Sequence, residues 1–134
     1  MSEPIQLKID RNVFNDKFYP HLFDYSCRWE VYNGSAGSGK SYFISQKLII
    51  KAMNDQRRIL ICRKWGSTIR ETVWQLIIEQ LTFFKLIDMC DVNKTERTIR
   101  LPNGSQFIFM SLDEETKLLS LQSVSDIWIE EAFE

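Results

Sequence analysis

A chain of 134 residues has room for one domain, and at that length about 68–70% of the unfolded surface can be buried on folding. Hydrophobic residues make up 44% and charged residues 26% of the chain, which excludes a disordered or collagen-like protein. Seventeen basic and eighteen acidic residues give a net charge of −1, so the composition lacks the basic excess typical of a nucleic-acid binder.

The sequence contains no recognisable targeting signal or metal-binding cysteine pair. No apolar run approaches the roughly 20 residues of a membrane-spanning helix, and the start, MSEPIQLKID, lacks the pattern of a signal peptide. Cys27, Cys62 and Cys90 are widely spaced, and we expect reduced thiols of a cytosolic protein, with Cys62 buried in a strand. His21 is the only histidine, which disfavours a Ser-His-Asp triad and a histidine-ligated zinc site.

The first predicted elements surround a glycine-rich loop. Residues 28–33, RWEVYN, predict a short strand, and residues 41–54 predict a helix because their apolar residues recur at helical spacing. Residues 57–64, RRILICRK, are an apolar run flanked by charge, which is typical of a buried parallel strand. We expect residues 1–26 to be an N-terminal extension of a core that spans residues 27–134.

A second helix is predicted at about residues 68–86. Thr68 and Glu71 can form a capping box at its start, and one of its faces is apolar except for Gln80. That face is expected to pack on the sheet.

The last third of the chain changes to a strand-like pattern. Residues 88–110 alternate around PNGS, a strong reverse-turn signal, and predict an antiparallel hairpin. A short helix is expected at residues 112–121, and residues 126–131, DIWIEE, predict a buried strand that ends in two carboxylates. The order of strands and helices favours an α/β fold.

The stretch YNGSAGSGKS, residues 32–41, satisfies G-x-x-x-x-G-K-S from Gly34 to Ser41. Glycines let the loop wrap a phosphate with its backbone N–H groups pointing inward, and the following helix adds the positive end of its dipole. Lys40 would then neutralise the outer phosphates, and the hydroxyl of Ser41 is placed to ligate Mg²⁺. The motif predicts a P-loop that binds a triphosphate.

The acidic pair Glu130 and Glu131 directly follows the apolar residues of the last strand. A carboxylate at a strand tip can hold Mg²⁺, and a second one beside it can orient and polarise an attacking water, which suits hydrolysis. We assign Glu130 to the metal, because it continues the apolar run, and Glu131 to the water. A solvated, charged strand end is the alternative interpretation.

Three stretches together resemble the ATPase domain of phage terminase large subunits, the motors that package DNA into proheads. RWEVYNGSAGSGKSYFISQKLI resembles the family's strand–loop–helix opening, and ILICRKWGSTIRETVWQLI is similar to its second strand and following helix. FIFMSLDEETKLLSLQSVSDIWIEEAFE resembles the segment that leads to the acidic strand, and this is the most family-specific of the three.

The resemblance implies a fold, a reaction and partners. The fold would be an incomplete P-loop NTPase domain of the additional-strand type, with a mostly parallel sheet flanked by helices and a small antiparallel hairpin insertion. The reaction would be hydrolysis of ATP with Mg²⁺, coupled to translocation of double-stranded DNA by a ring of large subunits. The partners would be the small terminase subunit and the portal protein, in the host cytoplasm and transiently at the prohead, with no membrane.

The site residues follow from the resemblance by position. Lys40 and Glu131 would be catalytic, and Ser41 and Glu130 would hold the metal. The nucleotide-binding positions would be Gly34, Ser35, Ala36, Gly37, Ser38, Gly39, Lys40, Ser41 and Tyr42.

The chain departs from the family's pattern at two points. Many relatives carry an arginine in the phosphate loop where this chain has Ala36, so the transition-state charge would be stabilised from elsewhere. Arg63 is our candidate, and a solvated residue at a strand end is the alternative. The chain also stops at Glu134, without the family's coupling strand and nuclease domain. We therefore expect a truncated fragment or shortened reading frame, with a gap in its sheet that favours self-association, and with weak or no turnover alone.

Two other functions stay open at this point. The chain could belong to another P-loop ATPase that acts on nucleic acid, of the helicase or recombination type, or it could be a non-catalytic nucleotide-binding remnant. An adenine platform could come from Tyr19, Phe23 and Trp29, although core packing is the more common role of such aromatic residues.

Overall fold

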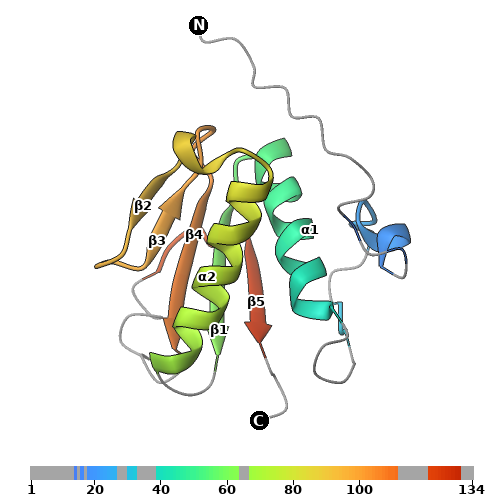
Figure 1. Ribbon diagram of the computed structural model, residues 1–134, viewed down its shortest axis with the longest axis horizontal. Helices are drawn as coiled ribbons and strands as arrows, with labels where there is room; N and C mark the ends of the chain where they lie inside the picture. The colour runs from blue at the N-terminus through green and yellow to red at the C-terminus, as the bar shows by residue number, and fades with distance from the viewer. Residues whose placement is uncertain are drawn as a thin grey trace, which may run out of the picture.

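The computed structural model describes residues 14, 16, 18–26, 30–32, 39–63, 67–111 and 121–130, and for residues 63 and 67–72 it describes the backbone alone. Within these ranges the chain forms an α/β fold in which two helices pack on a five-stranded sheet (Figure 1).

The sheet is mixed, with a parallel centre and an antiparallel hairpin at one side. Its strands, in chain order, are β1 Arg58–Arg63, β2 Asp91–Asn93, β3 Thr98–Arg100, β4 Gln106–Ser111 and β5 Asp126–Glu130. They lie in the order β2-β3-β4-β1-β5. β1 pairs in parallel with β4 and β5, whereas β3 is antiparallel to β2 and β4. The α/β class and the hairpin are confirmed, but the expectation of a mostly parallel sheet holds only for β4-β1-β5.

β1 is the central strand of the parallel part. Every residue from Ile59 to Cys62 is at most 5% exposed, and Ile59 and Ile61 belong to the main hydrophobic core with the helices. The continuous apolar run predicted this position. Cys62 is a free, buried thiol as expected, and burial raises its pKa to about 11.

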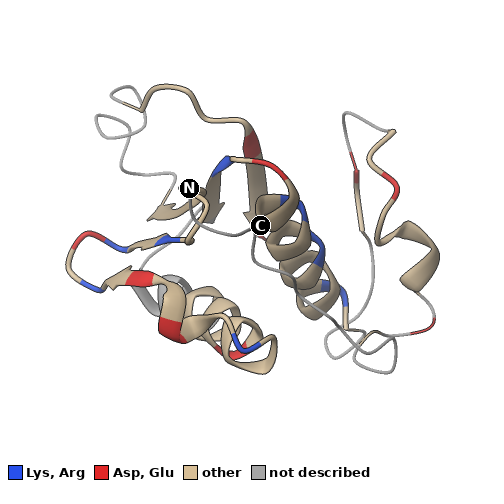
Figure 2. Ribbon diagram, turned by 90° about the horizontal axis from the view of Figure 1, so that it is seen from above, with Lys and Arg blue, Asp and Glu red and all other residues tan. Residues whose placement is uncertain are grey.

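Both described helices, α1 Lys40–Asn54 and α2 Ser67–Phe83, cover the same face of the sheet (Figures 1 and 2). The expected flanking of the sheet by helices is therefore seen on one face within the described residues. On the other face Ile127 and Ile129 of β5 are 62% and 45% exposed. The main hydrophobic core lies between the helices and the sheet and includes Phe43, Ile49, Ile59, Ile61, Trp74, Ile77, Leu81, Phe107, Phe109 and Trp128.

The strand predicted before the glycine-rich loop is not formed in its described part, Glu30–Tyr32. This segment pairs with none of the described strands, among which β5 has a partner on one side only. Side chains hold it against α1 instead. Lys47 donates a hydrogen bond to the carboxylate of Glu30, and the ring of Tyr32 packs edge-on against Phe43 with centroids 5.4 Å apart.

α2 ends earlier than predicted, in a Schellman motif that has no glycine. The N–H of Leu86 donates to the carbonyl of Leu81 at 2.8 Å, and the N–H of Lys85 donates to Thr82 at 3.0 Å. Lys85 has φ 60°, a left-handed conformation that side chains adopt at a cost in free energy. A short 3₁₀ helix, η3 Ile87–Met89, follows.

The turn predicted from PNGS connects β3 to β4. The N–H of Gly104 donates to the carbonyl of Leu101 at 3.0 Å, and Gly104 has φ 91°. A side chain at this position would meet the amide of Gln56 at 2.8 Å. The amide of Gln56 ends a flexible, exposed side chain that can move aside, so the positive φ is the constraint that favours glycine here. The helix predicted at 112–121 falls on residues 112–120, which lie outside the described residues.

Candidate functional site

The first turn of α1 begins at the carboxyl ends of the parallel strands (Figure 1). Gly39 precedes the helix with φ 84°, a conformation that glycine adopts at little cost, and its carbonyl accepts the N–H of Phe43 at 3.0 Å. Lys40 and Ser41 are the first two helical residues, and both are half-buried. The rest of the predicted loop, Gly34–Ser38, lies outside the described residues.

The structure brings the serine of the loop motif to the first acid of the last strand. Ser41 Oγ donates a hydrogen bond to Glu130 Oε1 at 2.6 Å, although 89 positions separate the two residues in the sequence. Glu130 is the last residue of β5, which runs parallel to β1, so its carboxylate lies at the edge of the sheet where α1 starts. Lys40 is the neighbour of Ser41 in the same helical turn. Glu131 lies outside the described residues.

Two further positions share a row with Glu130 across the parallel strands. Arg63 of β1 is in register with Glu130 on one side and with Ser111 of β4 on the other. Ser111 is 3% exposed, and its place in this row was not predicted. The signal was a polar residue directly after the apolar run of β4. Only the backbone of Arg63 is described, so its role stays a prediction.

The oxygen atoms of Ser41 and Glu130 suit magnesium. A hydroxyl and a carboxylate are hard ligands that Mg²⁺ binds at about 2.0–2.1 Å in an octahedron, whose neighbouring ligands lie about 2.9 Å apart. The two oxygens are 2.6 Å apart, so they would need to move only slightly further apart to bind the same ion. Water and phosphate oxygens would complete the coordination. In the described part of the chain, no three His, Cys, Asp or Glu side chains gather into another metal-binding cluster.

Two lysines of α1 whose contacts were not predicted connect the helix to other segments of the chain. Lys47 is 5% exposed and donates hydrogen bonds to the carbonyl of Asp24, at 2.7 Å, and to the carboxylate of Glu30. Lys51, one turn further on, pairs with Asp126 at the start of β5. The signal in the sequence was the four-residue spacing of the two lysines, which places them on the same face of the helix.

Part of the predicted adenine platform belongs to an aromatic cluster. Tyr19 contacts Phe14 and Phe23, with ring centroids 6.0 Å and 6.4 Å apart. Tyr19 packs against the hydrophobic core, whereas Phe23 is 59% exposed. Trp29 lies outside the described residues. Tyr42, a predicted nucleotide-binding residue, is 42% exposed in the first turn of α1.

The fold and the site define an α/β protein with a serine–carboxylate pair at the carboxyl ends of its parallel strands. The sequence profile of the phage terminase large subunit family matches residues 27–134, and the chain belongs to this family. The chain is 34% identical over 122 residues to the PBSX phage terminase large subunit of Bacillus subtilis (strain 168), an alignment that covers 86% of this chain and 28% of that protein. It is 26% identical over 135 residues to the terminase large subunit of Bacillus phage SPP1, covering 90% of this chain and 31% of the relative.

The family resemblance inferred from the sequence is therefore confirmed. The chain spans 28% and 31% of the lengths of these two relatives. No helix within the described ranges is long and apolar enough to cross a membrane.

Proposed function

We propose that this chain carries the ATP-binding and hydrolysing part of a phage DNA-packaging motor, in which Mg-ATP hydrolysis drives double-stranded DNA into a prohead. The observation that supports it most is the 2.6 Å hydrogen bond between Ser41 and Glu130. This contact joins the end of a phosphate-loop motif to an acidic strand tip. A merely solvated strand end would have no reason to meet this serine. Family membership supports the same function.

Each group of the site has its own task in this proposal. The backbone N–H groups of Gly34–Ser41 and the ammonium group of Lys40 bind the phosphates. Ser41 and Glu130 hold Mg²⁺, which when bound neutralises charge on the β- and γ-phosphates. Glu131 orients the attacking water and accepts its proton.

Arg63 is proposed to take the place of the arginine that many relatives carry in the loop, in its own or a neighbouring subunit. The loop has Ala36 where many relatives carry an arginine, and the backbone of Arg63 pairs with that of Glu130. A guanidinium group aimed at the transferred phosphoryl group stabilises its transition state. Tyr42, exposed in the first turn of α1, is proposed to contact the nucleotide.

The remaining proposals concern the full-length protein. Its partners would be double-stranded DNA, the small terminase subunit and the portal protein, with several large subunits forming a ring in the host cytoplasm. The net charge of −1 is compatible with this, because a ring can grip DNA with few basic residues from each subunit.

Calorimetric titration with Mg-ATP, combined with a turnover assay, tests the proposal. Lys40→Ala removes a charge-assisted contact that stabilises by about 1.5–3 kcal/mol, so the affinity should fall by a factor of about 10–100. Glu131→Gln should retain binding and lose turnover. Lys94→Ala, at an exposed turn between β2 and β3, is the matched control and should bind like the parent chain.

The outcomes separate the competing functions. If Lys40→Ala binds nucleotide as well as the parent chain, the enzymatic interpretation fails. Tight binding without turnover in the parent chain would instead support a nucleotide-binding remnant. ATPase activity that a short duplex stimulates without any packaging partner would favour a helicase-type ATPase.

A further inference from the structure

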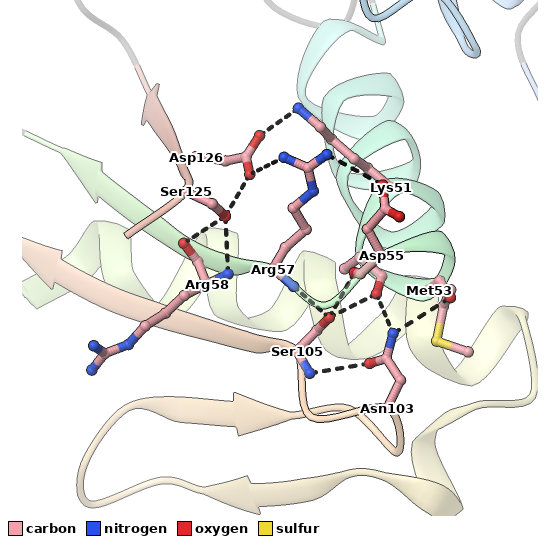
Figure 3. Close-up of polar contacts among 10 residues, drawn as sticks. Lys51, Met53, Asp55, Arg57, Arg58, Asn103, Ser105, Ser125 and Asp126 are labelled. Carbon is pink, nitrogen blue, oxygen red and sulfur yellow. Dashed lines mark hydrogen bonds and ion pairs between the residues drawn. The ribbon is translucent and has the colours of Figure 1, made fainter. Parts of the chain in front are cut away.

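α1 and β5 meet a second time, at the ends of both elements that lie away from Ser41 and Glu130. Lys51, in the last turn of α1, pairs with Asp126, the first residue of β5, with Nζ and Oδ2 2.5 Å apart (Figure 3). The two side chains are 22% and 11% exposed, so water screens their attraction only in part. The ion pair therefore links the helix to the strand at a defined position.

Asp126 is held by three groups at once. Besides Lys51, Arg57 Nη1 lies 3.5 Å from Asp126 Oδ1, and Ser125 Oγ donates a 2.7 Å hydrogen bond to the same oxygen. Burial raises the pKa of Asp126, but the hydrogen bonds from Lys51 and Ser125 and the positive charges of Lys51 and Arg57 together outweigh burial and hold the pKa below its ordinary value. The carboxylate is thus charged at neutral pH, and both of its oxygens have partners.

The two contacts are matched in spacing along antiparallel elements. Ser41, at the start of α1, meets the last residue of β5, and Lys51, near the end of α1, meets the first. The helix rises about 15 Å from Ser41 to Lys51. The strand advances about 13 Å from Asp126 to Glu130. The contacts therefore brace α1 against β5 at both ends, and sliding the strand along the helix would break both.

The end of α1 is also fixed to the β3–β4 turn, independently of β5. Ser105 Oγ donates to the carbonyl of Ala52 at 2.7 Å, and Asn103 Nδ2 donates to the same carbonyl at 2.6 Å (Figure 3). Ser105 is fully buried, and its hydroxyl also accepts the N–H of Arg57 at 2.9 Å. The helix thus keeps its place on β1 and β4 without Asp126. β5 is paired with β1 alone among the described strands, and at this end its direct tie to α1 is the ion pair between Asp126 and Lys51.

We propose that Asp126 is a positioning residue of the magnesium site: through Lys51 it sets where the tip of β5 lies along α1, and hence how Glu130 faces Ser41. The inference rests on the proposed function and adds to it a residue at the far end of β5 from the metal. Mg²⁺ demands a near-ideal octahedron, so small displacements of one ligand weaken its binding. Without this anchor, the ladder with β1 still sets the register of β5, but the start of the strand is no longer held to α1 by an ion pair.

The test compares two carboxylates that share a partner. Asp126→Asn removes the charge of the anchor while keeping its shape. Asp55→Asn is the matched control, because Asp55 Oδ2 lies 3.2 Å from Nη2 of the same Arg57 but its side chain is 65% exposed and belongs to the turn after α1. For each variant, binding of a fluorescent ATP analogue is measured first in EDTA and then as Mg²⁺ is titrated at a fixed analogue concentration.

Asp126→Asn should raise the Mg²⁺ concentration at half-saturation about threefold, a modest effect because Asp126 contacts neither Ser41 nor Glu130. Its metal-free affinity for the analogue should match that of the parent chain, and Asp55→Asn should leave both quantities unchanged. The Ser41→Ala variant lacks one of the two ligands that Asp126 is proposed to align. In that variant Asp126→Asn should therefore cause little further rise in the Mg²⁺ concentration at half-saturation. A purely stabilising role for Asp126 predicts equal effects in both backgrounds.

The inference is overturned if Asp126→Asn titrates with Mg²⁺ like the parent chain, or if it weakens metal-free binding by the same factor. Should Asp126→Asn fail to fold, Lys51→Met takes its place, since it leaves Asp126 paired with Arg57 and Ser125. If the parent chain binds no nucleotide at all, the proposed function itself fails. Normal binding by the parent chain with an unchanged Asp126→Asn titration defeats this inference alone.

Discussion

Replacement of Gln80 by leucine should stabilise the fold. Gln80 is fully buried on the apolar face of α2, and neither Oε1 nor Nε2 of its amide has a hydrogen-bond partner in the described part of the chain. An unsatisfied buried polar group costs about 1–3 kcal/mol. Leucine removes this cost, but its different shape is expected to destabilise the packing by up to about 1.5 kcal/mol. We expect a net gain of about 1–2 kcal/mol, which raises Tm by about 3–6 °C.

Urea denaturation followed by circular dichroism measures the change, with the m-value as a check that the transition itself is unaltered. Gln75→Leu is the matched control, because Gln75 lies on the exposed side of the same helix and its replacement should change stability by no more than about 0.5 kcal/mol. The reasoning is refuted if Gln80→Leu is less stable than the parent chain or no different from Gln75→Leu. Either result would mean that the amide of Gln80 is satisfied.

Three further predictions concern the ends of elements. Lys85→Gly should stabilise by about 0.5–1 kcal/mol in the same denaturation assay, because glycine relieves the left-handed backbone and loses only part of that gain to unfolded-state entropy; a loss of stability would contradict the Schellman geometry. Ser105→Ala should destabilise by about 1–3 kcal/mol, since it removes the buried hydrogen bond to the carbonyl of Ala52 and the acceptor of the partly buried N–H of Arg57. Ser125→Ala removes an exposed hydroxyl that accepts the N–H of Arg58, so it should destabilise the fold less than Ser105→Ala does. Equal losses of stability would refute the argument. The lowered pKa of Asp126 contributes stability that is present above its unfolded pKa of about 3.9 and is lost as the pH falls through the folded value. Asp126→Asn should therefore lose less stability than the parent chain between about pH 5 and pH 2, and an identical acid transition would contradict this.

Elements with a local signature could be predicted from the sequence. The apolar run at residues 57–64 became β1, which is paired on both sides and buried from Ile59 to Cys62, and the helical spacing at residues 41–54 became α1. The end of α2 was misplaced because Lys85 occupies a position where a glycine normally signals the stop. The strand expected before the loop failed at Glu30–Tyr32, since strand formation requires a neighbouring strand and no local pattern encodes that neighbour.

The same distinction applies to the site. The meeting of Ser41 and Glu130 could be predicted, because each half has its own motif and a parallel sheet brings strand tips and helix starts to one edge. The pair of Lys51 and Asp126 could not, because 75 positions separate two charged residues that have no signature beyond their charge. The capping of α1 by Ser105 likewise arises only when the hairpin packs against the helix.

The central claim of this account is that Ser41 and Glu130 hold one metal ion together with a nucleotide. Mn²⁺ binds oxygen ligands like those of Mg²⁺ and is paramagnetic, so water-proton relaxation measures how tightly the Mn²⁺–ATP complex binds to the chain. We predict that Ser41→Ala and Glu130→Gln each weaken this binding and that the double variant loses less than the sum of the two effects, because both residues serve one ion. If Glu130→Gln binds the Mn²⁺–ATP complex as tightly as the parent chain, the claim is wrong.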